Sequence, residues 1–122
     1  KSNLNDKLDK MANEEEFSDL QTLVHEMAKE KGWWNPPKSF GEQAVLFHAE
    51  ISEAIEEYRD GHEMTKIYFM REKPEGVPIE LADVIIRIMD TCEYYNIDLW
   101  NAIRMKVQYN STRSQRHGGK VI

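Results

Sequence analysis

Four carboxylates in this sequence form two pairs with the same spacing. Glu50 and Glu53 stand three residues apart in "AEISEAIEEYRDG", and Glu80 and Asp83 stand three apart in "IELADVIIRIMD". Both segments have the periodicity of a helix, and residues three apart lie on one helix face. Four carboxylates that converge would repel one another strongly unless cations separated them. Because oxygen-only ligands suit Mg²⁺, with Mn²⁺ as an alternative ion, the two pairs predict a cradle for a divalent metal.

The place of the acidic stripe on its helix favours a site over a solvated surface. A helix on a protein surface keeps its charges opposite its apolar face. In the first segment, the stripe of Glu50, Glu53 and Glu57 has apolar residues on both of its sides. Glu56 lies off this stripe, so it provides an internal control for any role of the acids.

A plainer interpretation treats the same acids as solvated surface residues. Glu80 falls in the first turn of a predicted helix, where the helix dipole favours acidic side chains. Asp83 and Arg87 have the i, i+4 spacing of a surface ion pair. Either pair alone fits this interpretation, whereas two pairs, each set into an apolar helix, favour the metal site.

The basic residues are concentrated at the other end of the chain. Residues 1–98 carry all 22 acidic residues and 11 of the 16 Lys and Arg, a net charge of −11, whereas residues 99–122 carry five basic residues and no acid. Lys106, Asn110 and Arg113 share one helix face, and such side chains suit phosphate oxygens. Cations are also favoured at helix C-termini. For Arg116 and Lys120, phosphate binding and simple stabilisation of a helix C-terminus are equally good interpretations.

Composition indicates a globular protein with a single domain. The chain has 122 residues, of which 40% are hydrophobic and 31% charged. No apolar run has the length of a membrane span, and the acidic body argues against nucleic-acid binding. The single Cys92 excludes an intramolecular disulfide and a cysteine-based zinc site. These features predict a cytoplasmic protein that binds neither membrane nor nucleic acid.

The elements that must position these residues are helices. A flexible leader is expected over residues 1–12 and a single helical domain over 13–122. Residues 61–77 are the least regular part, and "KIYF" within them fits a short strand or a helical turn. We predict an all-α bundle of about four main helices whose core is completed by oligomerisation, because so small a chain offers broad apolar faces. The predicted helices begin near Asn13, Ser39, Pro78 and Asp98, from capping residues and an N-terminal proline.

Several segments resemble the MazG-like, all-α nucleoside triphosphate pyrophosphohydrolases. E-I-S-E at 50–53 and E-L-A-D at 80–83 match the ExxE…ExxD signature of that family. The resemblance covers roughly residues 17–122. The further similar segments are "KGWW" at 31–34, "SFGEQAVLFHAEISEAIEEYR" at 39–59, "KPEGVPIELADVIIRIMD" at 73–90 and "K…N..R…HGGK" at 106–120.

The resemblance implies Mg²⁺-dependent hydrolysis of a nucleoside triphosphate to the monophosphate and pyrophosphate, which cleans the nucleotide pool. It implies that Glu50, Glu53, Glu80 and Asp83 hold the metal, with Glu53 also acting on the attacking water. It further implies that helices of two subunits form one bundle, and the broad apolar faces of the helices predict a homodimer or homotetramer. The alternative function is a helical oligomer that binds metal or nucleotide in a regulatory, weakly catalytic or non-catalytic role.

The resemblance also bears on the base of the substrate. In the similar dCTP pyrophosphatases a His and a Trp contact the base, and His25 and Trp34 fall at matching positions. This match favours a deoxynucleotide with a pyrimidine or a non-standard base. The alternatives are that Trp34 packs in the core under the Pro36-Pro37 turn and that His25 lies on a polar helix face.

Overall fold

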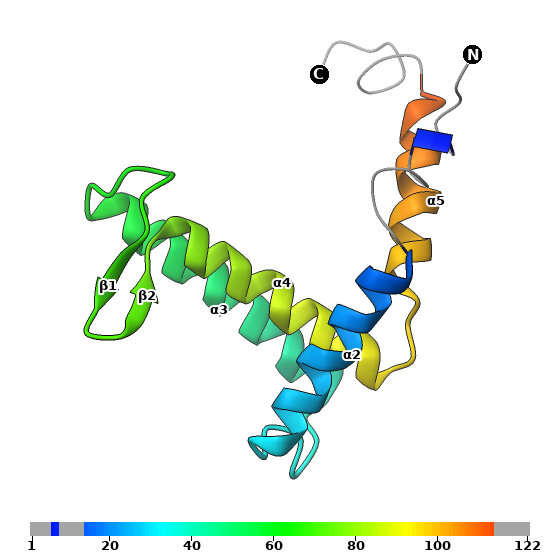
Figure 1. Ribbon diagram of the computed structural model, residues 1–122, viewed down its shortest axis with the longest axis horizontal. Helices are drawn as coiled ribbons and strands as arrows, with labels where there is room; N and C mark the ends of the chain where they lie inside the picture. Colours follow the sequence, from blue (N-terminus) through cyan, green and yellow to red (C-terminus); the bar gives the residue numbers. More distant parts are fainter. Residues whose placement is uncertain (1–5, 8–13, 114–122) are drawn as a thin grey trace.

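The computed structural model describes residues 6–7 and 14–113, and these form an all-α arrangement with one small hairpin (Figure 1). The prediction of about four main helices is confirmed for this part of the chain. The elements are α2 (Glu14–Glu30), α3 (Phe40–Arg59), β1 (Tyr68–Met70), β2 (Lys73–Glu75), α4 (Val77–Tyr94) and α5 (Leu99–Ser111).

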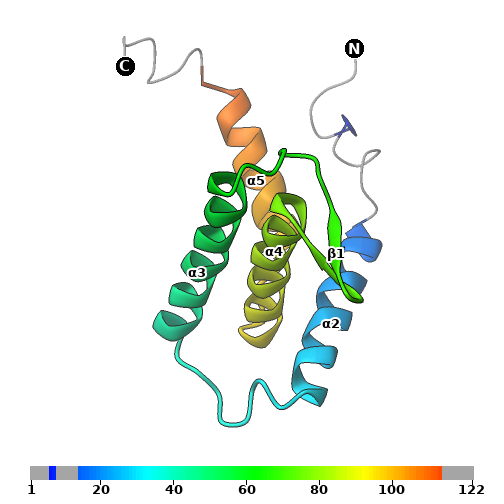
Figure 2. The ribbon, with the colours of Figure 1, turned by 90° about the vertical axis from the view of Figure 1, so that its left-hand side faces the viewer.

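Helix α4 is the centre of the fold. It lies between α2 and α3 and contacts both, as Figure 2 shows. Its buried side chains include Val84, Met89 and Cys92, and small residues such as Ala28 of α2 and Ala54 of α3 are buried as well. The wide apolar arc predicted for this helix is therefore explained in part by its two helical neighbours.

Local signals in the sequence define where the helices begin. The Ser39 side chain accepts a hydrogen bond from the backbone of Glu42, and the Glu42 side chain accepts one from Ser39, which is the predicted capping box. Asp98 caps α5 as predicted. Helix α4 begins at Val77, one residue before Pro78, because proline fits the first helical turn. The predicted cap Asn13 lies outside the described residues.

The irregular segment between α3 and α4 contains a two-stranded antiparallel hairpin. Tyr68 pairs with Glu75, so of the two interpretations of "KIYF" the short strand is the correct one. Gly76 joins β2 to α4 at a φ of 126°, and a Cβ there would overlap the carbonyl oxygen of Lys66. Glycine at this position lets the hairpin lie close to the first turn of α4.

A large amount of apolar surface remains exposed on α3 and α4. Ile51 and Ile55 on α3 are 43% and 51% exposed, and Leu81 and Ile85 on α4 are 46% and 55% exposed. Patches of this kind on a small protein mark interaction surfaces. They agree with the expectation of an oligomer, which stays a prediction. None of the helices among the described residues has the length and apolar character needed to cross a membrane.

Candidate metal centre

Three carboxylates from two helices converge at the end of α4 that adjoins the hairpin. Glu50 of α3 and Glu80 and Asp83 of α4 each offer an oxygen atom, and these oxygens all lie within 4.8 Å of one another. The i, i+3 spacing places Glu80 and Asp83 on one face of α4, and the packing of α3 on α4 brings Glu50 to that face. We call these three residues the acidic cluster.

The environment of the acidic cluster disfavours the ionised forms of Glu80 and Asp83, although Arg87 already pairs with Glu50. Burial, followed by the neighbouring carboxylates of Asp83 and Glu50, raises the pKa of Glu80 from 4.5 to about 7. Burial and the charge of Glu50 also raise the pKa of Asp83. A raised carboxyl pKa means that the environment disfavours the ionised form. A bound divalent cation would reverse this preference, because it attracts the ionised form of all three side chains.

The donor set and its spacing fit Mg²⁺. With metal–oxygen distances of about 2.1 Å, two ligand oxygens lie about 3 Å apart when adjacent and about 4.2 Å apart when opposite. The three oxygens of the acidic cluster lie within 4.8 Å of one another, so they are close enough to converge on one ion after side-chain adjustment. The all-oxygen set suits Mg²⁺ or Mn²⁺ over softer metals.

The fourth predicted ligand, Glu53, lies at the edge of this arrangement. Its side chain is exposed, and it is not among the three residues whose oxygens lie within 4.8 Å of one another. It is near enough that its negative charge also helps to raise the pKa of Glu80. The structure thus brings three of the four predicted ligands together and places Glu53 beside them, facing solvent.

A second group of acids shares Glu80 with the acidic cluster. Oxygen atoms of Glu57, Glu75 and Glu80 lie within 4.8 Å of one another, and Glu75 comes from the hairpin. The Tyr68 hydroxyl donates a 2.8 Å hydrogen bond to Glu57, which raises the pKa of Tyr68 to about 12 and keeps it a donor. The position of Glu57 on the same helix face as Glu50 could be predicted from the sequence. The proximity of Glu75 could not be predicted, because it depends on the hairpin.

Arg87 forms an ion pair with a member of the acidic cluster. Its Nε–H donates to Glu50 Oε2 at 2.7 Å, across the interface between α4 and α3. The solvated interpretation of the sequence paired Arg87 with Asp83 on the same helix. The observed partner is on another helix, so this pair is a tertiary contact rather than a surface i, i+4 pair.

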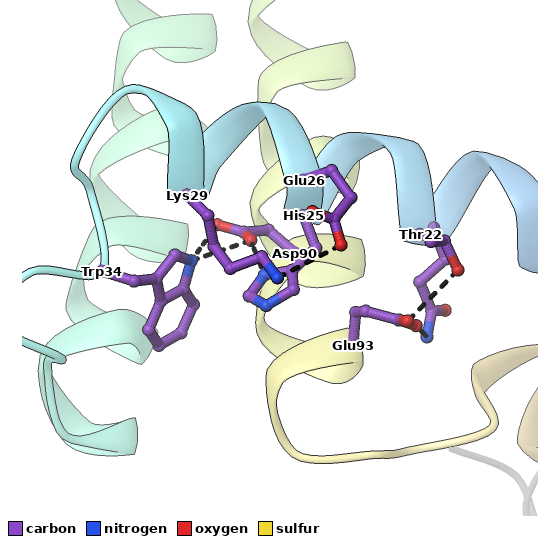
Figure 3. A network of polar contacts seen from close by, with 8 residues as sticks. Thr22, His25, Glu26, Lys29, Trp34, Asp90 and Glu93 are labelled. Carbon is purple, nitrogen blue, oxygen red and sulfur yellow. Dashed lines mark hydrogen bonds and ion pairs between the residues drawn. The ribbon is translucent and has the colours of Figure 1, made fainter.

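His25 and Trp34, the predicted base-binding residues, meet at a buried aspartate that the sequence reasoning missed. His25 Nδ1 lies 2.7 Å from Asp90 Oδ1, and the Trp34 indole N–H donates to Asp90 at 2.9 and 3.1 Å, as Figure 3 shows. Both side chains belong to residues that are only 8% exposed. The Trp34 ring also stacks on Tyr94, at 4.1 Å between centroids.

Trp34 is buried, which agrees with the alternative that it packs in the core. Its role in base binding stays a prediction. Asp90 could have been found from the sequence, because it follows Asp83 by seven residues and therefore lies on the same face of α4. A cavity of about 250 Å³ still borders this network, and Trp34, Arg87 and Asp90 are among the residues that line it.

The predicted phosphate-binding residues lie on a different part of the chain. Lys106, Asn110 and Arg113 are exposed on or just after α5, which starts beyond the C-terminal end of α4 and points away from it (Figure 1). Along the axis of α4, about 20 Å separate Glu80 from that end. Within one chain the structure therefore does not bring these residues to the acidic cluster. Arg116 and Lys120 lie outside the described residues.

Comparisons of the chain with protein-family models, with curated proteins and with solved structures found no match. The resemblance to MazG-like enzymes therefore rests on the sequence segments quoted above. What the structure adds to them is the convergence of Glu50, Glu80 and Asp83 from two helices.

Proposed function

We propose that this protein is a metal-dependent hydrolase that converts a nucleoside triphosphate to the monophosphate and pyrophosphate, as a house-cleaning enzyme of the cytoplasm. The observation that carries the proposal is the acidic cluster, in which two helices present three carboxylates within 4.8 Å. A solvated acidic face would not be expected to raise the pKa of Glu80 to about 7, with burial as the largest cause. The family resemblance supplies the reaction.

In the proposed reaction, water forms a bond to the α-phosphorus while the bond from that phosphorus to the bridging oxygen of pyrophosphate breaks. Glu50, Glu80 and Asp83 would hold Mg²⁺, which when bound would neutralise phosphate charge and lower the pKa of water. Glu53, exposed beside the cluster, is the candidate to orient the attacking water and accept its proton. Its solvent-facing position is compatible with this role, because a base must reach water.

The phosphate side of the proposed site requires a second copy of the chain. Lys106 and Asn110 lie on α5 and Arg113 lies just after it, and α5 extends away from α4, which carries Glu80 and Asp83 of the same chain (Figure 1). In a homodimer or homotetramer, α5 of one copy would reach the cluster of another and hold the β- and γ-phosphates. The exposed apolar residues of α3 and α4 supply surface for that contact.

For the base we propose a deoxynucleotide with a pyrimidine or a non-standard base. The support is the sequence match of His25 and Trp34, together with the cavity that Trp34 and Asp90 line. Because both side chains already bond to Asp90, they would act at the edge of that cavity or after a rearrangement of the network.

The proposal is tested by identifying products. The protein is incubated with Mg²⁺ and a panel of normal and modified NTPs and dNTPs, and the phosphorus-containing products are identified by ³¹P NMR. Monophosphate and pyrophosphate are expected, with preference for a pyrimidine deoxynucleotide. Release of the nucleoside diphosphate and orthophosphate would rule out the proposed reaction. Metal or nucleotide binding without turnover would favour the regulatory alternative.

A further inference from the structure

Arg87 occupies a position that the proposed function leaves unexplained. Its Nε–H donates to Glu50 of the acidic cluster at 2.7 Å, and the residue also lines two cavities of about 250 and 240 Å³. Trp33, Arg87 and Asp90 line both cavities, and the second is also lined by Asp83. A single cationic side chain therefore contacts the carboxylates and borders the neighbouring space.

While Glu50 is paired with Arg87, fewer of its carboxylate lone pairs are available to coordinate a metal ion. A carboxylate has a limited number of lone-pair sites, and a charge-assisted hydrogen bond of 2.7 Å is among the strong ones. The guanidinium is permanently charged, so it neutralises one carboxylate at any ordinary pH. It would also repel a divalent cation placed between Glu50 and Asp83.

We propose that Arg87 is the counter-ion of Glu50 in the metal-free protein, and that a divalent cation binds the acidic cluster by displacing it. The displaced guanidinium then faces the adjoining cavity, where it is available to an anionic group of the ligand. This inference rests on the proposed function. It adds that Arg87 lowers the affinity of the acidic cluster for a divalent cation.

The side chain has the freedom that such a displacement needs. Its exposed fraction is 31%, compared with 16% for the Glu50 side chain, so the arginine is the more accessible partner. The cavities beside it offer space for the guanidinium once the ion pair opens. A planar guanidinium can bind two oxygens of a phosphate just as it can bind the two oxygens of a carboxylate. Arg87 could therefore replace its hydrogen bond to Glu50 by hydrogen bonds to a phosphate.

The experiment measures the binding of Mn²⁺ alone to the full chain by calorimetry, for wild type, Arg87→Met and Arg87→Lys. Loss of the competing charge in Arg87→Met should tighten Mn²⁺ binding by about tenfold, the size expected for one charge-assisted hydrogen bond. Arg87→Lys keeps a competing cation and should stay within about threefold of wild type. Arg59→Met is the matched control, because Arg59 pairs only with the exposed Glu56 on α3 among the ion pairs that the structure describes.

Melting temperatures provide a second readout that a merely structural role would not reproduce. Arg87→Met should melt below wild type without metal, and the difference should shrink when Mn²⁺ is saturating. Equal losses with and without Mn²⁺, or Mn²⁺ binding that is unchanged or weaker in Arg87→Met, would overturn the role of Arg87 while leaving the metal site intact. A wild-type protein that binds no Mn²⁺ would overturn both this inference and the proposed function.

Discussion

Replacing Glu80 by Gln should stabilise the metal-free protein near pH 8. The substitution keeps the size of the side chain and removes the charge that the acidic cluster holds least favourably. Burial and the neighbouring carboxylates raise the pKa of Glu80 to about 7, compared with 4.5 for an ordinary glutamate. At pH 8 the native protein must ionise this group in an environment that opposes ionisation, and the glutamine variant avoids that cost.

The size of the effect follows from the pKa shift after allowance for solvent. At 1.36 kcal/mol per unit, the full shift would correspond to roughly 3 kcal/mol. Because Glu80 is only partly buried, solvent screening reduces the expected gain to about 1 kcal/mol. For a chain of this size, that gain corresponds to a rise in Tm of roughly 4 °C.

The pH dependence has a definite sign. Below about pH 4.5 the group is protonated in both folded and unfolded chains, so wild type and Glu80→Gln should then have similar stability. Between pH 4.5 and 7 the folded protein binds more protons than the unfolded chain, and its stability therefore falls as pH rises through this window. The stabilising effect of the variant should appear across the same window and level off above it.

Mg²⁺ should reverse the order of the two proteins. Wild type gains about 2.7 kcal/mol when the free ion is at 100 times its Kd, whereas Glu80→Gln has lost a ligand and should gain much less. The assay is differential scanning fluorimetry at pH 5 and pH 8, with and without Mg²⁺, and Glu56→Gln is the control because Glu56 is exposed. A lower Tm of Glu80→Gln than of wild type at pH 8 without metal, or an equal shift of both proteins by Mg²⁺, would contradict this role of Glu80.

Other predictions address catalysis, phosphate binding and assembly. Asp83→Asn and Glu53→Gln should each lower kcat by orders of magnitude with the fold intact by circular dichroism; near-wild-type turnover would place the site elsewhere. Lys106→Ala and Arg113→Ala should weaken substrate binding and slow turnover while Mg²⁺ binding stays intact. If these two residues only complement a helix terminus, stability should fall by about 0.3–1 kcal/mol with unchanged kcat/KM. Light scattering should show a homodimer or larger, and a stable, active monomer at low micromolar concentration would contradict this.

Signals that act within one turn of helix could be predicted from the sequence. The capping box of Ser39 and Glu42, the Asp98 cap and the proline at the start of α4 each depend on neighbours only a few residues away. The hairpin before α4 could not be assigned, because its three-residue strands carry little periodicity. It also depends on the close approach of Gly76 to Lys66, which is a tertiary contact.

The candidate site was predictable to the extent that helix geometry determines it. The pair of Glu80 and Asp83 lies on one face because of spacing alone. Which carboxylate of α3 would join that pair depends on how α3 packs against α4, and the packing selects Glu50 while leaving Glu53 facing solvent. The burial of Trp34 against Asp90 is likewise tertiary, since 56 residues separate the two in the chain.

The proposed reaction requires that water attacks the α-phosphorus of a nucleoside triphosphate at the acidic cluster. Hydrolysis of a preferred substrate in H₂¹⁸O with Mg²⁺, followed by mass spectrometry of the products, tests it most directly. Attack at the α-phosphorus should place one ¹⁸O atom in the nucleoside monophosphate and none in the pyrophosphate, and the reaction should be lost in Asp83→Asn. Label in pyrophosphate or orthophosphate, or undiminished turnover in Asp83→Asn, would contradict it.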